Sequence, residues 1–259
     1  MQIPIYQVDA FTDKLFGGNP AAVCPLTHWP DAGLMQAIAA ENNLSETAFL
    51  VPQGERYGLR WFTPVAEIDL CGHATLASAH IIFHYLAIHS ERVEFETRSG
   101  LLIVSREGSQ LAMDFPARPG QSCTAPEALL RGLGTTPREV FRSRDYLAVL
   151  DSEAQVRAVV PDPLALAELD ATGVIITAPG DEVDFVSRFF APREGIPEDP
   201  VTGSAHCTLV PYWSRRLCRT QLRGRQISAR GGELLCEDLG ERVKISGESV
   251  VYLEGTIRV

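Results

Sequence analysis

The sequence lacks the short motifs that mark common nucleotide- and metal-binding proteins. None of its six cysteines forms a C-x-x-C pair, no G-x-G-x-x-G opens a helix, and no G-x-x-x-x-G-K-[ST] occurs. These absences exclude the dinucleotide and P-loop fingerprints. His80 and His84 stand four residues apart, but no third ligand accompanies them, so we expect no metal and no cofactor.

Basic residues are also scarce, with 23 Lys and Arg against 33 Asp and Glu, for a formal net charge of -10. A compact acidic protein is a poor candidate for binding nucleic acid or an anionic membrane, although a local site can still attract a small anionic substrate. The N-terminus lacks the basic start and apolar core of a signal peptide. The cysteines are spread over a chain large enough to need no disulfides, so we expect reduced thiols and a cytoplasmic protein.

What the sequence does contain is an internal repeat. The stretches "FTP" and "FAP" each precede an acidic residue, a glycine and then small and apolar residues, in "EIDLCGHATL" and "EDPVTGSAHC". Phe62 and Phe190 stand 128 residues apart, Gly72 and Gly203 stand 131 apart, and the segments that begin at Thr97 and Ala229 stand 132 apart. Landmarks in the same order with so little drift indicate a duplication with a period near half of the 259 residues.

The two copies predict two halves of similar construction. Each half reads as a strand, a helix, short strands, a glycine-started helix and a final hairpin. The proline-rich stretch from 116 to 126 is the best boundary, so we assign residues 1–117 to the first half and 118–249 to the second. The last strand, 250–259, has no counterpart and is expected to return to the first half.

The glycine-started helix of the first half is apolar on nearly every side. The segment 70–88 contains three histidines, so it predicts a buried helix and not a membrane span. A helix with so little polar face must be enclosed, and a curved sheet around a central helix is the simplest container. In the second half, Pro211 should bend or end the equivalent helix.

Helices that begin at "GHAT" and "GSAH" present free backbone N–H groups, which favour anions. If the two halves face each other, both helix starts would line one cleft and hold a substrate carboxylate. The simpler interpretation is that Gly72 and Gly203 are turn glycines, which the duplication makes less attractive. Asp199 could anchor an amine or hydroxyl group and Ser204 could donate to a carboxylate, but both residue types also serve as helix caps.

Two residues are candidates for carrying a proton. Glu46 lies between a helix end and an apolar strand, where apolar surroundings would raise the pKa of a carboxylate and suit it to take and return a proton. Its plainer alternative is an edge-strand glutamate that faces water, and His73 could either tune Glu46 or cap its helix. Cys71 would serve a two-thiol racemase, but the matching position in the second half is Thr202, so a small buried residue is the simpler interpretation.

Several segments together resemble the phenazine-biosynthesis-F-like (PhzF-like) family, which is related to diaminopimelate epimerase and proline racemase. They are "QVDAFTDKLFGGNPAAV", "NNLSETAFL", "RWFTPVAEIDLCGHATLASA", "MDFP" and "EDPVTGSAHCTLVPYW", and they span nearly the whole chain. The resemblance implies an α+β, diaminopimelate-epimerase-like fold with two pseudo-symmetric domains, each a sheet rolled around a central helix.

The resemblance also implies a function. In the isomerase of this family, the glutamate of "NLSET" shuttles a proton within a dihydro-hydroxyanthranilate, and that role falls on Glu46. Residues expected to bind or polarise the substrate are Asn19, Gly72, His73, Asp199, Gly203 and Ser204. We therefore expect a cofactor-independent isomerase of a small cyclic or amino-acid-like carboxylate, and a homodimer. The alternatives are an amino-acid racemase, epimerase or related dehydratase that uses Cys71, and a catalytically inactive protein that binds a small ligand.

Overall fold

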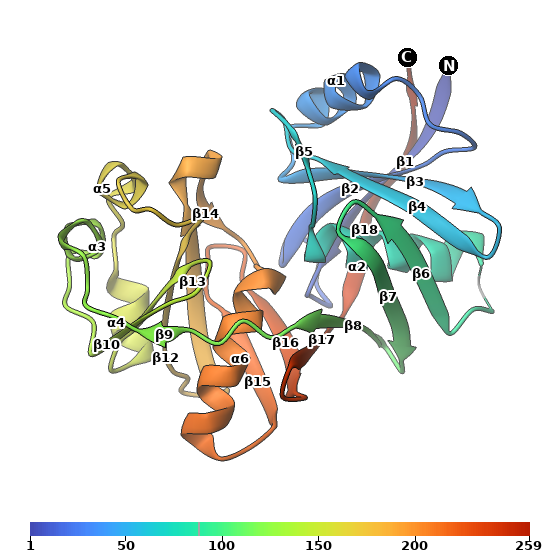
Figure 1. Ribbon diagram of the computed structural model, residues 1–259. Helices are drawn as coiled ribbons and strands as arrows, with labels where there is room; N and C mark the ends of the chain where they lie inside the picture. Colours follow the sequence, from blue (N-terminus) through green and yellow to red (C-terminus); the bar gives the residue numbers. More distant parts are fainter. Residues whose placement is uncertain (88) are drawn as a thin grey trace. The chain divides into compact units, whose positions relative to one another are not determined.

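The computed structural model describes residues 1–87 and 89–259 and divides the chain into two compact units (Figure 1). Unit 1 comprises Met1–Asp114 and Ser246–Val259, and unit 2 comprises Phe115–Ile245. Sequence analysis placed the divisions after residues 117 and 249. Ile88, the last residue of the predicted apolar helix, lies outside the described residues.

Unit 1 consists mainly of strands. Its elements are β1 (Gln2–Ala10), β2 (Asn19–Pro25), α1 (Ala32–Asn42), β3 (Glu46–Gln53), β4 (Arg56–Phe62), β5 (Glu67–Ile68), α2 (Gly72–Ile81), a π-helical turn (Ile82–Leu86), β6 (Arg92–Thr97), β7 (Gly100–Glu107), β8 (Gln110–Pro116) and β18 (Ser249–Arg258). The first division of the chain falls within β8. Strand β2 pairs antiparallel with β1 and parallel with β3, and β3 continues antiparallel into β4.

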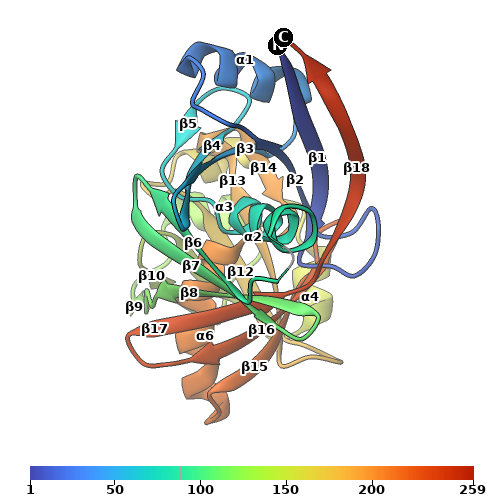
Figure 2. The same cartoon turned by 90° about the vertical axis from the view of Figure 1, so that its right-hand side faces the viewer.

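Helix α2 runs inside the curved strands of unit 1, as Figure 2 shows end-on. Eight of its ten residues are buried, on every side of the helix. Among them, Ala74, Leu76, Ala77 and Ile81 are all fully covered. A helix without a solvated face can form only where the sheet surrounds it, as the sequence predicts. A second, smaller core lies under α1, where Met35 and Ile38 pack against Phe49.

The predicted apolar helix does not run regularly to its end. It widens into the π-helical turn after Ile81, where the Ala87 N–H donates to the Ile82 carbonyl over 2.6 Å. Tyr85 and Leu86 in this turn are exposed, so the enclosed part ends earlier than the composition suggests. In the part of the chain that the structure describes, no helix has the length and apolarity needed to cross a membrane.

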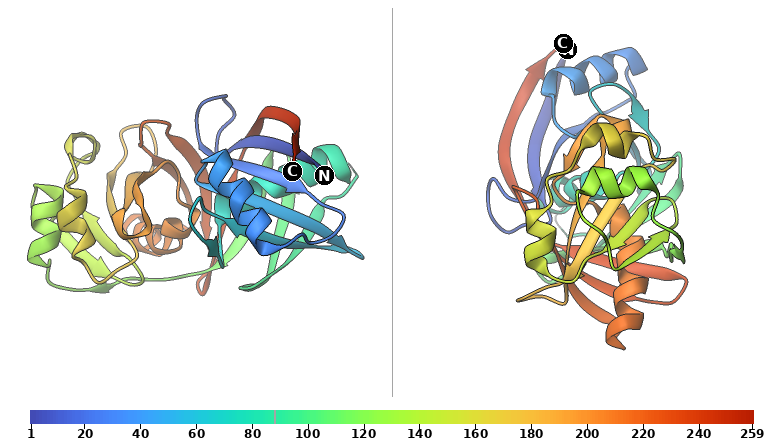
Figure 3. Two further views of the ribbon diagram at one scale, coloured as in Figure 1. Left: turned by 90° about the horizontal axis from the view of Figure 1, so that it is seen from above. Right: turned by 90° about the vertical axis from the view of Figure 1, so that its left-hand side faces the viewer.

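The last strand returns to the first. Strand β18 pairs antiparallel with β1 from Gln2↔Arg258 to Ala10↔Ser249, with one register shift after Gln7. The two ends of the chain therefore lie side by side, as Figure 3 shows. This pairing places the C-terminal segment in unit 1, although the whole of unit 2 separates the two strands in the sequence.

Unit 2 has the same mixture of strands and short helices. Its elements are β9 (Gln121–Ser122), α3 (Glu127–Leu133), β10 (Glu139–Arg142), β11 (Tyr146–Val149), α4 (Glu153–Ala158), α5 (Pro163–Ala167), β12 (Val174–Pro179), β13 (Phe185–Ala191), a 3-10 turn (Pro192–Glu194), β14 (Ile196–Asp199), α6 (Gly203–Leu217), β15 (Gln221–Gln226), β16 (Gly232–Asp238) and β17 (Arg242–Gly247). The second division falls within β17. Strands β11 and β12 pair parallel, as do β13 and β15, and the long, largely buried helix α6 contacts β15 and β16.

Pro211 was predicted to bend or end helix α6. It does not end the helix, which continues to Leu217. A proline lacks the N–H that would bond to the carbonyl four residues earlier, which here belongs to Cys207. The backbone N–H of Arg118 donates to that carbonyl over 2.8 Å. A segment distant in sequence thus supplies the missing donor, and helix-breaking rules based on local sequence do not anticipate it.

Candidate active site

The predicted site residues fall into two groups, one in each unit. In unit 1, Asn19 and Glu46 begin β2 and β3, and Gly72 and His73 begin α2. Strands β2 and β3 are parallel, so their first residues lie at the same edge of the sheet. Helix α2 packs on β2, which brings the start of the helix to that edge.

The start of α2 has no side-chain cap. Its N-cap, Cys71, has extended backbone angles and makes no side-chain cap hydrogen bond. The first N–H groups of a helix have no partner within the helix, so this start retains donors for an anion. His73 does not cap the helix, as one alternative had it, but turns toward the strands.

Glu46 and His73 face each other within the protein. Glu46 Oε2 lies 2.9 Å from His73 Nε2, and the two side chains are only 8% and 6% exposed. The alternative of a water-facing glutamate is therefore wrong. The surroundings of Glu46 are not purely apolar, because His73 gives the buried carboxyl group an ionisable partner.

The two side chains of Glu46 and His73 lie close together without forming a full hydrogen bond. The ring N–H does not point squarely at Oε2, and this oxygen is buried without a full hydrogen bond from the described residues. On the other side of the ring, Asn19 Nδ2 lies 3.2 Å from His73 Nδ1. The Asn19 amide and the Glu46 carboxyl group therefore contact opposite nitrogens of the ring.

Two opposing effects set the protonation of His73. Burial alone would lower its pKa, but the neighbouring Cys71 and Glu46 outweigh that effect, and the pKa of His73 is raised well above its ordinary value. The neighbouring groups thus favour the protonated form of the imidazole.

Cys71 completes this group. Its Sγ lies 3.5 Å from His73 Nδ1, and burial, reinforced by the charge of Glu46, raises the pKa of the thiol to about 11. Cys71 is thus protonated at neutral pH and is a poor nucleophile. Glu46, Cys71 and His73 have donor atoms within 4.8 Å of one another, a set that a thiophilic cation could use. The protonated thiol and the engaged ring nitrogens favour an acid–base group instead.

In unit 2, Asp199 and Thr202 form a short loop before α6. Thr202 Oγ1 donates to Asp199 Oδ2, and Thr202 is the N-cap of α6 without a side-chain cap bond. The N-cap position of α6 is therefore held by Thr202 and not by Asp199 or Ser204. Thr202 holds the same position at α6 that Cys71 holds at α2, which agrees with the duplication.

Gln226 anchors the loop before α6. It is fully buried at the end of β15, and its Oε1 accepts from the Thr202 N–H over 2.9 Å. Its Nε2 donates to the Asp199 carbonyl over 2.7 Å and lies 3.2 Å from Thr202 Oγ1. Sequence reasoning missed Gln226, because only the return of β15 to this loop gives the residue its role.

Ser204 follows Gly203 in the first turn of α6 and accepts a hydrogen bond from Arg144 Nη2 over 3.0 Å. Sequence reasoning missed Arg144 too, because no motif marks this residue as part of the site. The only available signal was a charged residue in a tight turn beside a buried strand.

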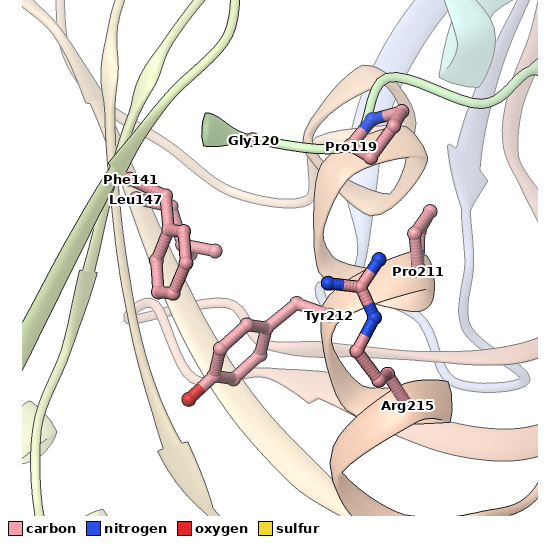
Figure 4. Close-up of a pocket in the computed structure, with 7 residues that line it drawn as sticks. All are labelled: Pro119, Gly120, Phe141, Leu147, Pro211, Tyr212 and Arg215. Carbon is pink, nitrogen blue, oxygen red and sulfur yellow. The ribbon is translucent and has the colours of Figure 1, made fainter. Parts of the chain in front are cut away.

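A cavity elsewhere in unit 2 is too small to be a substrate site. It lies between the 119–120 segment, β10, β11 and the middle of α6, as Figure 4 shows. Its volume is about 20 Å³, which accommodates roughly one water molecule. The cavity therefore does not compete with the helix starts as a binding site.

Comparison with known proteins decides the family. The model of the phenazine biosynthesis-like protein family matches residues 8–255. The chain belongs to this family. It is 52% identical, over the full length of both chains, to an uncharacterized isomerase of Pseudomonas aeruginosa. The crystal structure of a PhzF-family phenazine biosynthesis protein from Enterococcus faecalis superposes with a TM-score of 0.98 at 47% identity, covering 100% of each chain.

A more distant structure shows the fold alone. A hydroxyproline epimerase from Agrobacterium vitis superposes with a TM-score of 0.65 at 10% identity, covering 99% of this chain and 92% of its own. The predicted family and the diaminopimelate-epimerase-like fold are confirmed, and the chain is an isomerase of this family.

Proposed function

We propose that the protein moves a proton within a small cyclic or amino-acid-like carboxylate, without a cofactor, and that Glu46 carries the proton. The observation that supports this most directly is the buried contact of 2.9 Å between Glu46 Oε2 and His73 Nε2. The resemblance to the PhzF family suggests a dihydro-hydroxyanthranilate as the first substrate to test.

The chemistry follows from the charges of this pair. The carboxylate of Glu46 accepts a proton from one substrate carbon, and the C–H bonding electrons remain on the substrate as a delocalised anion. Protonation of Glu46 cancels its attraction to the imidazolium of His73, so returning the proton to another carbon restores that attraction. Atoms and oxidation state are conserved, so the step is an isomerisation that needs no redox group.

The alternative that uses Cys71 rests on its 3.5 Å approach to His73 Nδ1. A thiol base must first lose its proton, and a pKa of about 11 makes that costly at neutral pH. Each pKa unit corresponds to about 1.4 kcal/mol, so roughly four units above neutral add more than 5 kcal/mol to the barrier. This cost counts against Cys71 as the base.

Solvent-deuterium incorporation tests the proposal. Wild type is incubated in deuterated buffer with dihydro-hydroxyanthranilate and a panel of small cyclic and amino-acid carboxylates, and NMR follows incorporation at carbon. We expect exchange in at least one compound and its loss, by about 10²–10⁴-fold, in Glu46→Gln. Glu67→Gln is the matched control, because Glu67 pairs with Arg60 in the same unit and not with His73. Binding of panel compounds without exchange would show an inactive binding protein instead.

A further inference from the structure

The turn between β10 and β11 is attached to the first turns of α6 at two points. Ser143 Oγ lies 3.1 Å from Thr208 Oγ1, and Arg144 Nη2 lies 3.0 Å from Ser204 Oγ. Ser204 and Thr208 are four residues apart and therefore lie on one face of the helix. The turn thus places a guanidinium directly against one hydroxyl of the predicted site.

The Arg144 guanidinium is also paired with the side chain of its neighbour, Asp145. Its Nη2 and Nε lie 3.1 and 3.3 Å from Asp145 Oδ2. The Asp145 side chain is 2% exposed, whereas that of Arg144 is 37% exposed. A buried carboxylate therefore fixes a partly exposed guanidinium, which restricts the direction in which Arg144 can point.

This contact determines which way the Ser204 hydroxyl can donate. A guanidinium has five N–H donors, no acceptor and a permanent charge, so Ser204 Oγ must accept from it. The hydroxyl hydrogen is then directed elsewhere and must donate. A hydroxyl that accepts from a cation is also a stronger donor, because linked hydrogen bonds polarise one another. The partner it favours is a group that only accepts, and a carboxylate is such a group.

We propose that Arg144 is a positioning residue that makes Ser204 a dedicated donor to the substrate carboxylate and so selects acids over their neutral amides. This inference rests on the proposed function for its substrate class. Arg144 acts through Ser204. It affects the preference for acids over amides more than the stability of the fold.

Calorimetric binding of two unreactive aromatic ligands tests this inference. The first is 2-amino-3-hydroxybenzoate and the second is its primary amide, each titrated into wild type, Arg144→Met, Arg144→Lys and Ser204→Ala. We expect wild type to prefer the acid, and Arg144→Met to bind the acid about tenfold more weakly while binding of the amide changes by less than about twofold. Arg144→Lys retains a donor-only cation and should recover most of the preference.

The double variant Arg144→Met/Ser204→Ala should bind the acid no more weakly than Ser204→Ala alone, because the two residues act in series. Arg142→Met is the matched control, since Arg142 ends β10 two residues before Arg144 but bonds to the Tyr146 hydroxyl. The inference is overturned if wild type does not bind the acid, or if Arg144→Met leaves the acid preference unchanged or weakens both ligands equally. Neither ligand undergoes turnover, so these results are independent of the exchange assay that decides the proposed function.

Discussion

The starts of α2 and α6 occupy corresponding places in the two copies of the duplication and have become different. At α2, Cys71, Glu46 and His73 form a buried group of ionisable side chains around one imidazole. At α6, Thr202 and Gln226 form a network of hydrogen bonds that also includes the Asp199 carboxyl group and the His206 imidazole. Both helices begin at an N-cap residue that makes no side-chain cap hydrogen bond, so the difference between them lies in the surrounding side chains.

The comparison suggests a division of labour. The ionisable side chains at α2 can gain and lose a proton. The Gln226 amide and the Thr202 hydroxyl at α6 only donate and accept hydrogen bonds, which fix the conformation of the loop. We therefore expect substitutions at α2 to affect proton exchange more than stability, and substitutions at α6 to affect stability or binding more than exchange.

Replacing His73 should produce the largest difference between the effect on proton exchange and the effect on stability. His73→Gln removes the charge that faces Glu46 and should lower the exchange rate by about 10²-fold, which corresponds to about 2.7 kcal/mol in the barrier. Deuterium incorporation measures the loss, and His84→Gln, at an exposed position of the same unit, is the control. Exchange at the wild-type rate would remove His73 from the proton step and erase the contrast between the two helix starts.

Replacing Gln226 should have the opposite profile. Gln226→Leu leaves the Thr202 N–H and the Asp199 carbonyl without their buried partner. This loss should lower the free energy of unfolding by about 2 kcal/mol. Thermal or urea unfolding measures this, with Gln221→Leu at an exposed position of the same strand as the control. If Gln226→Leu unfolds like wild type, the network at α6 does not hold the loop.

The smallest expected effect is the pH dependence of stability that arises from His73 in α2. The pKa of His73 is raised in the folded protein, so its contribution to stability is complete below the unfolded value of about 6.5 and is lost as pH rises through the folded value. The stability difference between wild type and His73→Gln should therefore be larger at pH 6 than at pH 9. A difference that grows with pH would contradict the assigned direction.

Local pattern was sufficient for much of this molecule. The spacing of Phe62 and Phe190 and of Gly72 and Gly203 predicted the repeated construction, and the apolar run after Gly72 predicted an enclosed helix. These features depend on neighbours in sequence or on composition, which a single chain displays.

What the sequence could not predict depends on segments that meet only in the fold. The persistence of α6 past Pro211 needs the N–H of Arg118, and the loop before α6 needs Gln226. The surroundings of Glu46 looked apolar from its own strand, yet His73 arrives from a helix that begins 26 residues later. Polar partners across long separations carry no periodic signal, so the candidate site was found by its residues and not by its contacts.

The central claim is that Glu46 carries the proton and Cys71 does not. It is tested most directly by measuring deuterium incorporation for Glu46→Gln and Cys71→Ala side by side, on the compound that wild type exchanges fastest. We predict that Glu46→Gln loses at least about 10²-fold while Cys71→Ala stays within about tenfold of wild type, a change of no more than about 1.4 kcal/mol. Loss of exchange in Cys71→Ala with retention in Glu46→Gln would contradict the account and assign the proton to the thiol.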